Sequence, residues 1–218
     1  MVSDHPTSKR ITARWKEGYV KVVCPRRLSK KQIREAVDQM APKLKKVEQP
    51  AMKIADIVLP DWRLNVRRQS IEPHKAIVEG SLPEMTLLIG SAINLDDADG
   101  AMLFNRLALA AGKRVAPPLL LPRARQIARE LGVGPKEWTI SHGRKVLGHC
   151  SADKKIALSY ICVFLPPELR DYIICHELAH LRHMDHSPKF HALCDVYCRR
   201  REKELIRKLR HYQWPIRK

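Results

Sequence analysis

The stretch Tyr172–His191, YIICHELAHLRHMDHSPKFH, holds five histidines and one glutamate within twenty residues. Pro167 precedes it at a typical first helical position, and apolar residues follow at the spacing of one helix face. In such a helix His176 and His180 lie one turn apart on the same face, so both imidazoles can reach one metal ion at about 2.0 to 2.1 Å. The stretch therefore predicts a helix that carries a metal site.

Glu177 directly follows the first of these histidines, in an HExxH pattern. It is displaced by about 100° around the helix, which lets its carboxylate lean over the open side of a bound ion. There it can accept a proton from a water molecule, as the glutamate of zinc hydrolases does. We predict that Glu177 is the general base.

The third protein ligand has three candidates, His183, His186 and His191. His183 follows His176 by seven residues, about 10.5 Å along a straight helix, which is too far for one ion to bind both of them together with His180. The chain must therefore fold back to complete the site.

The dipeptide Ser187–Pro188 provides the turn, because serine is a common N-cap and proline a common first residue of a helix. His186 is left in this turn, six residues after His180, which is also the interval in the metzincin pattern. We rank His186 first as the third ligand. His191, one turn into the next helix, is the alternative ligand or a group that orients a ligand, and His183 remains an accessory candidate.

The composition predicts a packed protein with a basic surface. The 218 residues are 44% hydrophobic, and 41 Lys and Arg against 23 Asp and Glu give a net charge of +18. Such a charge makes nucleic acid or a nucleotide a reasonable partner. No signal-peptide core and no apolar run of about 18 residues is present, so we expect a soluble, cytoplasmic protein with no membrane partner. Six cysteines without a CxxC pair suggest neither disulfides nor a zinc ribbon. The oligomeric state is not predicted.

The first half of the chain reads as β-rich. Residues 10–25 alternate around a Lys-Glu-Gly turn and predict a hairpin. A helix should follow over 28–40, with Ser29 and Gln32 as a capping box and Pro42 as its end. Short strands are then predicted within residues 54–59, 62–69, 74–80 and 84–90.

The second half reads as helices around two strands. Helices are predicted over residues 95–114 and 121–134, the second closed by Gly132, and strands over 137–151 and 154–164. The last strand leads into the metal helix through a short loop. We predict that it is an edge that pairs with an extended peptide substrate, with a core strand as the equally weighted alternative.

The segment CHELAHLRHMDHSPKFHAL, residues 175–193, resembles the signature of the YgjP-like zinc metallopeptidases, which are relatives of the SprT-like proteases. Residues 11–37, ITARWKEGYVKVVCPRRLSKKQIREAV, are similar to the opening hairpin and helix of that family. Residues 146–180 are similar to its last strands and active-site helix. The resemblance covers most of the chain and is weakest over 47–117.

The resemblance implies one Zn²⁺ per chain, held by His176, His180 and His186, with Glu177 as the catalytic base. Two departures concern the surroundings of the metal. The chain has KVLGHCS at residues 145–151 where the family commonly has an Arg-Trp-Gly-Ser-Cys-Ser run, and it has His191 where the family commonly has tryptophan. These changes leave the ligands intact and alter an aromatic wall and a guanidinium beside them.

We predict an α+β fold with a zincin-like metallopeptidase core. Residues 1–98 form the β-rich N-terminal region, and residues 99–218 form the catalytic domain with the HExxH helix and a basic C-terminal helix. The predicted function is a zinc-dependent hydrolase that cleaves polypeptides with a zinc-activated water. A nucleotide pyrophosphohydrolase and a nucleic-acid-binding module with structural zinc are the alternatives.

Further residues are candidates by chemical type. A second oxyanion donor is usual in acyl transfer, and the chain offers Tyr172, Tyr160, His149 and Arg144. Carboxylates that orient ligand imidazoles are sought among Asp185, Glu168 and Asp195. The basic tail also mixes cations and aromatic rings in a way that suits nucleic acid, through Arg199, Arg200, Arg201, Tyr212 and Trp214.

Overall fold

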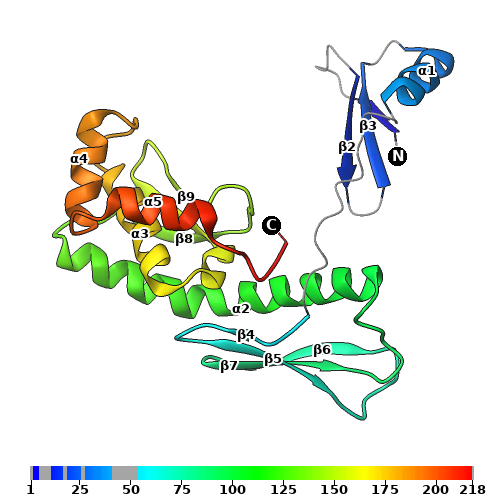
Figure 1. The fold of residues 1–218 in the computed structure, drawn as a ribbon. Coiled ribbons are helices and arrows are strands. Elements are labelled where there is room, and N and C mark those ends of the chain that lie inside the picture. Colours follow the sequence, from blue (N-terminus) through cyan, green and yellow to red (C-terminus); the bar gives the residue numbers. More distant parts are fainter. Residues whose placement is uncertain (1, 5–10, 17–18, 26–27, 41–53, 218) are drawn as a thin grey trace. The chain divides into compact units, whose positions relative to one another are not determined.

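The structure is a computed structural model that describes residues 2–4, 11–16, 19–25, 28–40 and 54–217. The chain forms two compact units, Met1–Ala51 and Met52–Lys218 (Figure 1). This division differs from the predicted boundary between residues 98 and 99, because the strands after residue 54 share a core with the helices that follow them. The two units are described separately.

The first unit contains the predicted hairpin and helix. Strands β2 (Thr12–Lys16) and β3 (Tyr19–Cys24) pair in antiparallel fashion, and β1 (Val2–Asp4) pairs with β3 in parallel. Helix α1 (Lys30–Met40) begins with the capping box. The Ser29 backbone N–H donates to Gln32 Oε1 over 2.9 Å, and the Gln32 N–H donates to Ser29 Oγ over 3.3 Å. The hairpin turn at residues 17–18 and the helix end predicted at Pro42 lie outside the described residues.

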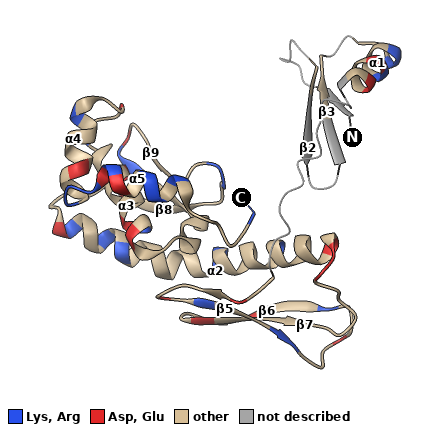
Figure 2. Cartoon of the chain, in the orientation of Figure 1, with Lys and Arg blue, Asp and Glu red and all other residues tan. Residues whose placement is uncertain are grey.

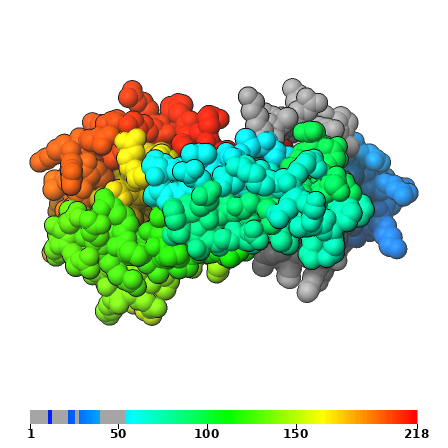
Figure 3. Space-filling view, turned by 90° about the horizontal axis from the view of Figure 1, so that it is seen from below, coloured from blue at the N-terminus to red at the C-terminus, as the bar shows by residue number. Residues whose placement is uncertain are grey.

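The second unit begins with a four-stranded sheet. Its strands are β4 (Ile57–Val58), β5 (Arg63–Arg68), β6 (Ala76–Ser81) and β7 (Glu84–Ile89), in the order β4-β5-β7-β6. All four strand predictions are confirmed. The sheet lies along helix α2 (Ala98–Glu130), and its other face forms part of the surface seen in Figure 3.

Trp62, which comes just before β5, ties this sheet to the helical part of the unit. Its indole N–H donates to the carbonyl of Val163 over 2.8 Å, and its ring centroid lies 5.5 Å from that of Phe164. Both aromatic side chains are almost fully buried. The sheet is therefore packed onto the segment that precedes the metal helix.

Helix α2 (Ala98–Glu130) corrects the prediction of two helices over residues 95–134. It runs as one helix through Pro117, Pro118 and Pro122, although proline removes a backbone donor and clashes with the preceding turn. Buried side chains continue along the helix on both sides of the prolines, so tertiary packing outweighs the local preference.

Gly132 closes α2 as predicted. Its φ is +64°, its N–H donates to the Arg129 carbonyl, and the Val133 N–H donates to the Ala128 carbonyl. This pair of bonds is a Schellman motif, in which glycine adopts the left-handed conformation without strain.

A three-stranded sheet follows α2, with β8 (Glu137–Ser141), β9 (Gly148–Cys150) and β10 (Lys155–Ser159) in the order β8-β10-β9. The strand predicted over residues 137–151 is thus two strands. The edge predicted for residues 154–164 is also wrong, because β10 is the central strand, parallel to β8 and antiparallel to β9. The edges of this sheet are β8 and β9.

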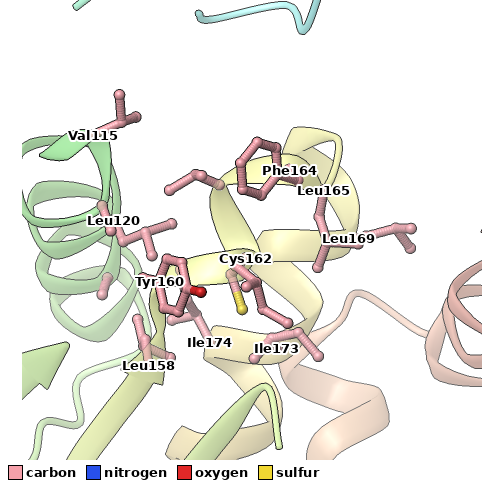
Figure 4. Packing of buried hydrophobic residues seen from close by; sticks show 14 of the residues in the cluster. Val115, Leu120, Leu158, Tyr160, Cys162, Phe164, Leu165, Leu169, Ile173 and Ile174 are labelled. Carbon is pink, nitrogen blue, oxygen red and sulfur yellow. The ribbon is translucent and has the colours of Figure 1, made fainter. Parts of the chain in front are cut away.

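The predicted strand over 154–164 ends at Ser159, where a 3₁₀ helix, η2 (Tyr160–Phe164), begins. All five of its residues are buried, and a run of consecutive buried residues does not suit a strand with one solvent face. Figure 4 shows η2 between α2 and helix α3 (Pro167–Ala179), with side chains of all three segments interleaved. This packing fixes the metal helix against the rest of the unit.

Three further helices complete the unit, α3 (Pro167–Ala179), α4 (Pro188–Tyr197) and α5 (Glu202–His211). The chain after α5 returns to the core, where the Tyr212 hydroxyl donates to the Phe164 carbonyl over 2.5 Å. In the part of the chain that the structure describes, small sheets combined with five helices make the protein α+β, as predicted. No helix among the described residues is long and apolar enough to cross a membrane.

Candidate metal centre

Helix α3 brings two histidines to one side of its last turn. Pro167 occupies its first turn, as predicted, and His176 and Glu177 lie near its end. His180 is the residue that caps the helix, and its N–H still reaches the carbonyl of His176 over 3.3 Å. The one-turn relation between the two imidazoles is therefore preserved, and their ring centroids lie 4.9 Å apart.

The turn after α3 brings His186 to this pair. Ser187 caps α4 through its side chain, which accepts from the Phe190 N–H over 3.4 Å. One ring nitrogen each of His176, His180 and His186 lies within 4.8 Å of the others, and the Nε2 atoms of His176 and His186 are 3.2 Å apart. The structure thus assembles three histidine nitrogens, with His186 in the third place.

The other two candidates for the third place have different roles. His183 contributes its carbonyl oxygen, which lies 2.9 Å from His180 Nδ1. A carbonyl can only accept, so Nδ1 of His180 carries the hydrogen and Nε2 keeps its lone pair for a metal. His191 points its Nδ1 at the carboxylate of Glu202 over 2.9 Å.

Phe190 lies against all three histidines, a role that the sequence analysis did not anticipate. Its side chain is fully buried, and its ring stacks on that of His180 with centroids 4.4 Å apart. The rings of His176 and His186 meet Phe190 edge to face at 4.9 Å. An apolar support of this kind keeps the imidazoles from rotating, because each alternative rotamer would lose packing.

The electrostatics of the cluster favour neutral imidazoles. Burial, together with the nearby His180 and His186, lowers the pKa of His176 to about 4. Burial also lowers the pKa of His180. Neutral imidazole is the form that binds metals, and three such nitrogens are a common protein ligand set for zinc. The residues therefore fit a metal ion.

Glu177 is buried beside this cluster, with 5% of its surface exposed. Burial raises the pKa of its carboxyl to about 7. Strand β9 lies directly against it: a methyl group added at Gly148 would stand 2.5 Å from Glu177 Oε1 and 2.6 Å from Cγ. The sequence analysis missed Gly148, although glycine inside a strand is a signal of close approach.

Replacing Gly148 with alanine is expected to lower kcat of the hydrolysis predicted for Glu177 by about 10- to 100-fold. The backbone at Gly148 suits alanine, but the new methyl must push the Glu177 carboxylate out of place. Zinc content should stay unchanged, because the methyl faces the glutamate. Gly143→Ala is the matched control, since nothing lies within 4 Å of a methyl there. Equal kcat for both variants and wild type would show that β9 does not set the position of Glu177.

The four oxyanion candidates lie in different settings. Tyr172 is buried, its ring meets that of His176 at 5.9 Å, and burial raises the pKa of its hydroxyl. Tyr160 belongs to the core, whereas His149 is exposed on β9. A cavity of about 330 Å³ extends from β9 along the preceding loop and includes Arg144. It is lined by Ser141, Gly143, Arg144, Lys145, Val146, Gly148 and His149.

The three predicted orienting carboxylates form no hydrogen bond with the cluster among the described residues, although the charge of Asp185 acts on His180. Glu168 pairs with Arg201 and Lys208, and Asp195 accepts from the backbone N–H of Glu202 over 3.0 Å. In the described part of the chain, neither they nor the exposed Asp185 hydrogen-bonds to any of the three cluster imidazoles.

Most of the five residues predicted to contact nucleic acid interact with other residues of the protein. Arg201 forms ion pairs with Glu168 and Glu204. Both acidic residues of α5 lie in its first turn, and the charged residues of its later turns are basic (Figure 2). Tyr212 is bonded to the core, and the Trp214 ring packs on it at 5.4 Å. The other two residues of this set are the exposed Arg199 and Arg200, and the Arg200 guanidinium lies 3.9 Å from a carboxylate oxygen of Asp195.

Comparison with known proteins gives one finding. The family model described as YgjP-like, metallopeptidase domain, matches residues 91–212, which is more than half of the chain and includes the whole histidine cluster. No curated protein and no solved structure matches the chain.

Proposed function

The chain belongs to the YgjP-like metallopeptidase family, and we propose that it is a zinc-dependent peptidase with Glu177 as its general base. The observation that carries the proposal is the convergence of His176, His180 and His186, with Glu177 directly after the first of them. These three histidines would hold the ion. When bound, zinc supplies Lewis acidity, which activates water and polarises a carbonyl.

Glu177 moves the proton in the proposed reaction. Its carboxylate accepts a proton from the water that attacks the peptide carbonyl, and then returns it to the leaving amine. A pKa near 7 suits both steps near neutral pH, because the group gives and takes a proton with similar ease. The close backbone of β9 at Gly148 keeps the carboxylate from turning away.

The position of strand β9 at a sheet edge favours a polypeptide as the substrate. The strand lies at the end of its sheet and directly beside Glu177. An extended peptide that pairs its main chain with β9 would therefore run past the base, and main-chain pairing is a common way to bind peptides at a sheet edge. This role replaces the one predicted for residues 154–164.

The histidine cluster also weighs against a structural zinc site. Among the described residues it has three members, whereas structural zinc sites are usually closed by four protein ligands. A nucleotide pyrophosphohydrolase would use the same base, so only substrate tests separate it from a peptidase.

Elemental mass spectrometry of the purified protein, followed by incubation with unfolded casein and with nucleoside triphosphates, tests the proposal. We expect about one zinc per chain, casein cleavage that a chelator abolishes, and recovery when zinc is added back. Release of pyrophosphate without casein cleavage would favour a nucleotide pyrophosphohydrolase over a peptidase. Zinc that binds without any hydrolysis of either substrate would contradict the enzyme proposal.

A further inference from the structure

A buried glutamate, Glu202, lies near His176. It is the first residue of α5 and is only 4% exposed. A ring nitrogen of His176, Cys194 Sγ and a carboxylate oxygen of Glu202 all lie within 4.8 Å of one another. The sequence analysis did not select Glu202, which is 26 residues further along the chain than His176.

His176 has one ring nitrogen without a partner. Its Nε2 faces His186 Nε2 at 3.2 Å and so belongs to the cluster. Its Nδ1 is buried and has no hydrogen-bond partner among the described residues. An unpaired buried N–H is costly, and His180 shows the usual solution in this site, since its Nδ1 donates to a carbonyl.

Glu202 is held in place by several contacts. Its Oε1 accepts from His191 Nδ1 over 2.9 Å, which leaves the second oxygen for another donor. Its backbone N–H donates to Asp195 Oδ1 over 3.0 Å. The preceding Arg199 and Arg200 have φ values of 55° and 64°, which non-glycine residues adopt only when their surroundings hold them there. The turn between α4 and α5 thus directs a carboxylate inward.

We propose that Glu202 is a positioning residue for the metal centre, and that it accepts a hydrogen bond from Nδ1–H of His176. This bond fixes the tautomer of His176 in which Nε2 carries the lone pair, and it holds the ring toward the other two histidines. A carboxylate behind a ligand histidine also raises the basicity of that ligand. The inference rests on the proposed function, because it takes His176 to be a ligand.

The α4–α5 turn is then part of the metal centre. His176 is buttressed by Glu202, His180 by the His183 carbonyl, and both rings by Phe190. Cys194 is buried, and its thiol lies within 4.8 Å of both the Glu202 carboxylate and a ring nitrogen of His176. A negative carboxylate accepts a stronger bond from an imidazole than a thiol does, so the role falls to Glu202.

The test compares Glu202→Gln and Glu202→Leu with Glu204→Gln, which removes a charge from the same helix on the outer side. Zinc affinity, measured by competition with a chelator, should fall about 10-fold in Glu202→Gln and up to about 100-fold in Glu202→Leu. Glu204→Gln should bind zinc as wild type does. Wild-type affinity in folded Glu202→Leu would overturn the proposal; if that variant does not fold, wild-type affinity in the nearly isosteric Glu202→Gln would do so.

Nitrogen-15 NMR of the histidine rings in the metal-free proteins gives a second readout. His176 should be in the Nδ1–H tautomer in wild type and in Glu204→Gln, and should become a mixture of tautomers in Glu202→Leu. An unchanged His176 tautomer in Glu202→Leu would also overturn the proposal. This readout needs neither zinc nor catalysis. A protein that shows the tautomer change but cleaves no peptide would therefore refute the peptidase function while leaving the role of Glu202 standing.

Discussion

Replacement of Glu177 by glutamine is expected to lower kcat for peptide hydrolysis by about 10³-fold, within the range that a general base contributes. The amide has nearly the shape of the carboxylate, so it fits against Gly148 in the same place. It cannot accept the proton from water, and that single property is what the variant loses.

Zinc binding should survive this substitution. The three histidine nitrogens come from other residues, and Glu177 is not among them. The neutral amide is also no harder to bury than a carboxylate, so the thermal midpoint should not fall. The measurements are kcat on a cleaved peptide, zinc per chain and thermal unfolding, made on the same preparation.

Glu168→Gln is the matched control, because it makes the same chemical change in the first turn of the same helix. Glu168 pairs with Arg201 and Lys208 at the surface, so its loss should affect stability slightly and leave kcat within about twofold. Full hydrolytic activity in Glu177→Gln would show that another group is the base. A loss of zinc in that variant would instead make Glu177 part of the metal site.

The sequence predicts the local course of the chain around the three histidines, because short spacings determine it. The interval between His176 and His180 is a property of one helix, and the Ser187–Pro188 dipeptide defines the start of the next. These local rules were sufficient to predict the course of the chain from the metal helix to His186. The capping box at Ser29 and the Schellman turn at Gly132 are predicted for the same reason.

Two of the missed residues, Gly148 and Glu202, act through partners that are distant in the sequence. Gly148 matters because β9 lies on α3, and Glu202 matters because the α4–α5 turn folds back to His176. Strand order is equally non-local: nothing within residues 154–164 shows that β10 lies between β8 and β9. A single sequence gives periodicity and turns, but not which surfaces meet.

Helix α2 shows the opposite error, because tertiary packing outweighs the local tendency of proline to interrupt a helix. Pro117 and Pro118 lie between the two predicted helices, yet the helix continues through them, because residues such as Val115, Leu120 and Ala124 bury their side chains along its length. Each lost hydrogen bond costs less than the packing that an interruption would remove. Local preference decides the outcome only where burial does not.

His186→Ala is expected to weaken zinc binding by more than about 100-fold, the upper range for the loss of a group that only orients a ligand. Hydrolysis should fall with the zinc content. The fold should remain, because His186 is exposed in the turn and the cap of α4 depends on Ser187 instead. The measurements are zinc per purified chain and competition with a chelator.

The chain offers two matched controls for this variant. His183→Ala keeps the backbone carbonyl that accepts from His180 and removes a side chain outside the cluster, so zinc should be retained. His191→Ala removes one donor to Glu202 and should have at most a small effect. If His186→Ala kept its zinc and one of the controls lost it, the third ligand would be His183 or His191. The turn that brings His186 to α3 would then be a metal-free arrangement that rearranges when the ion binds.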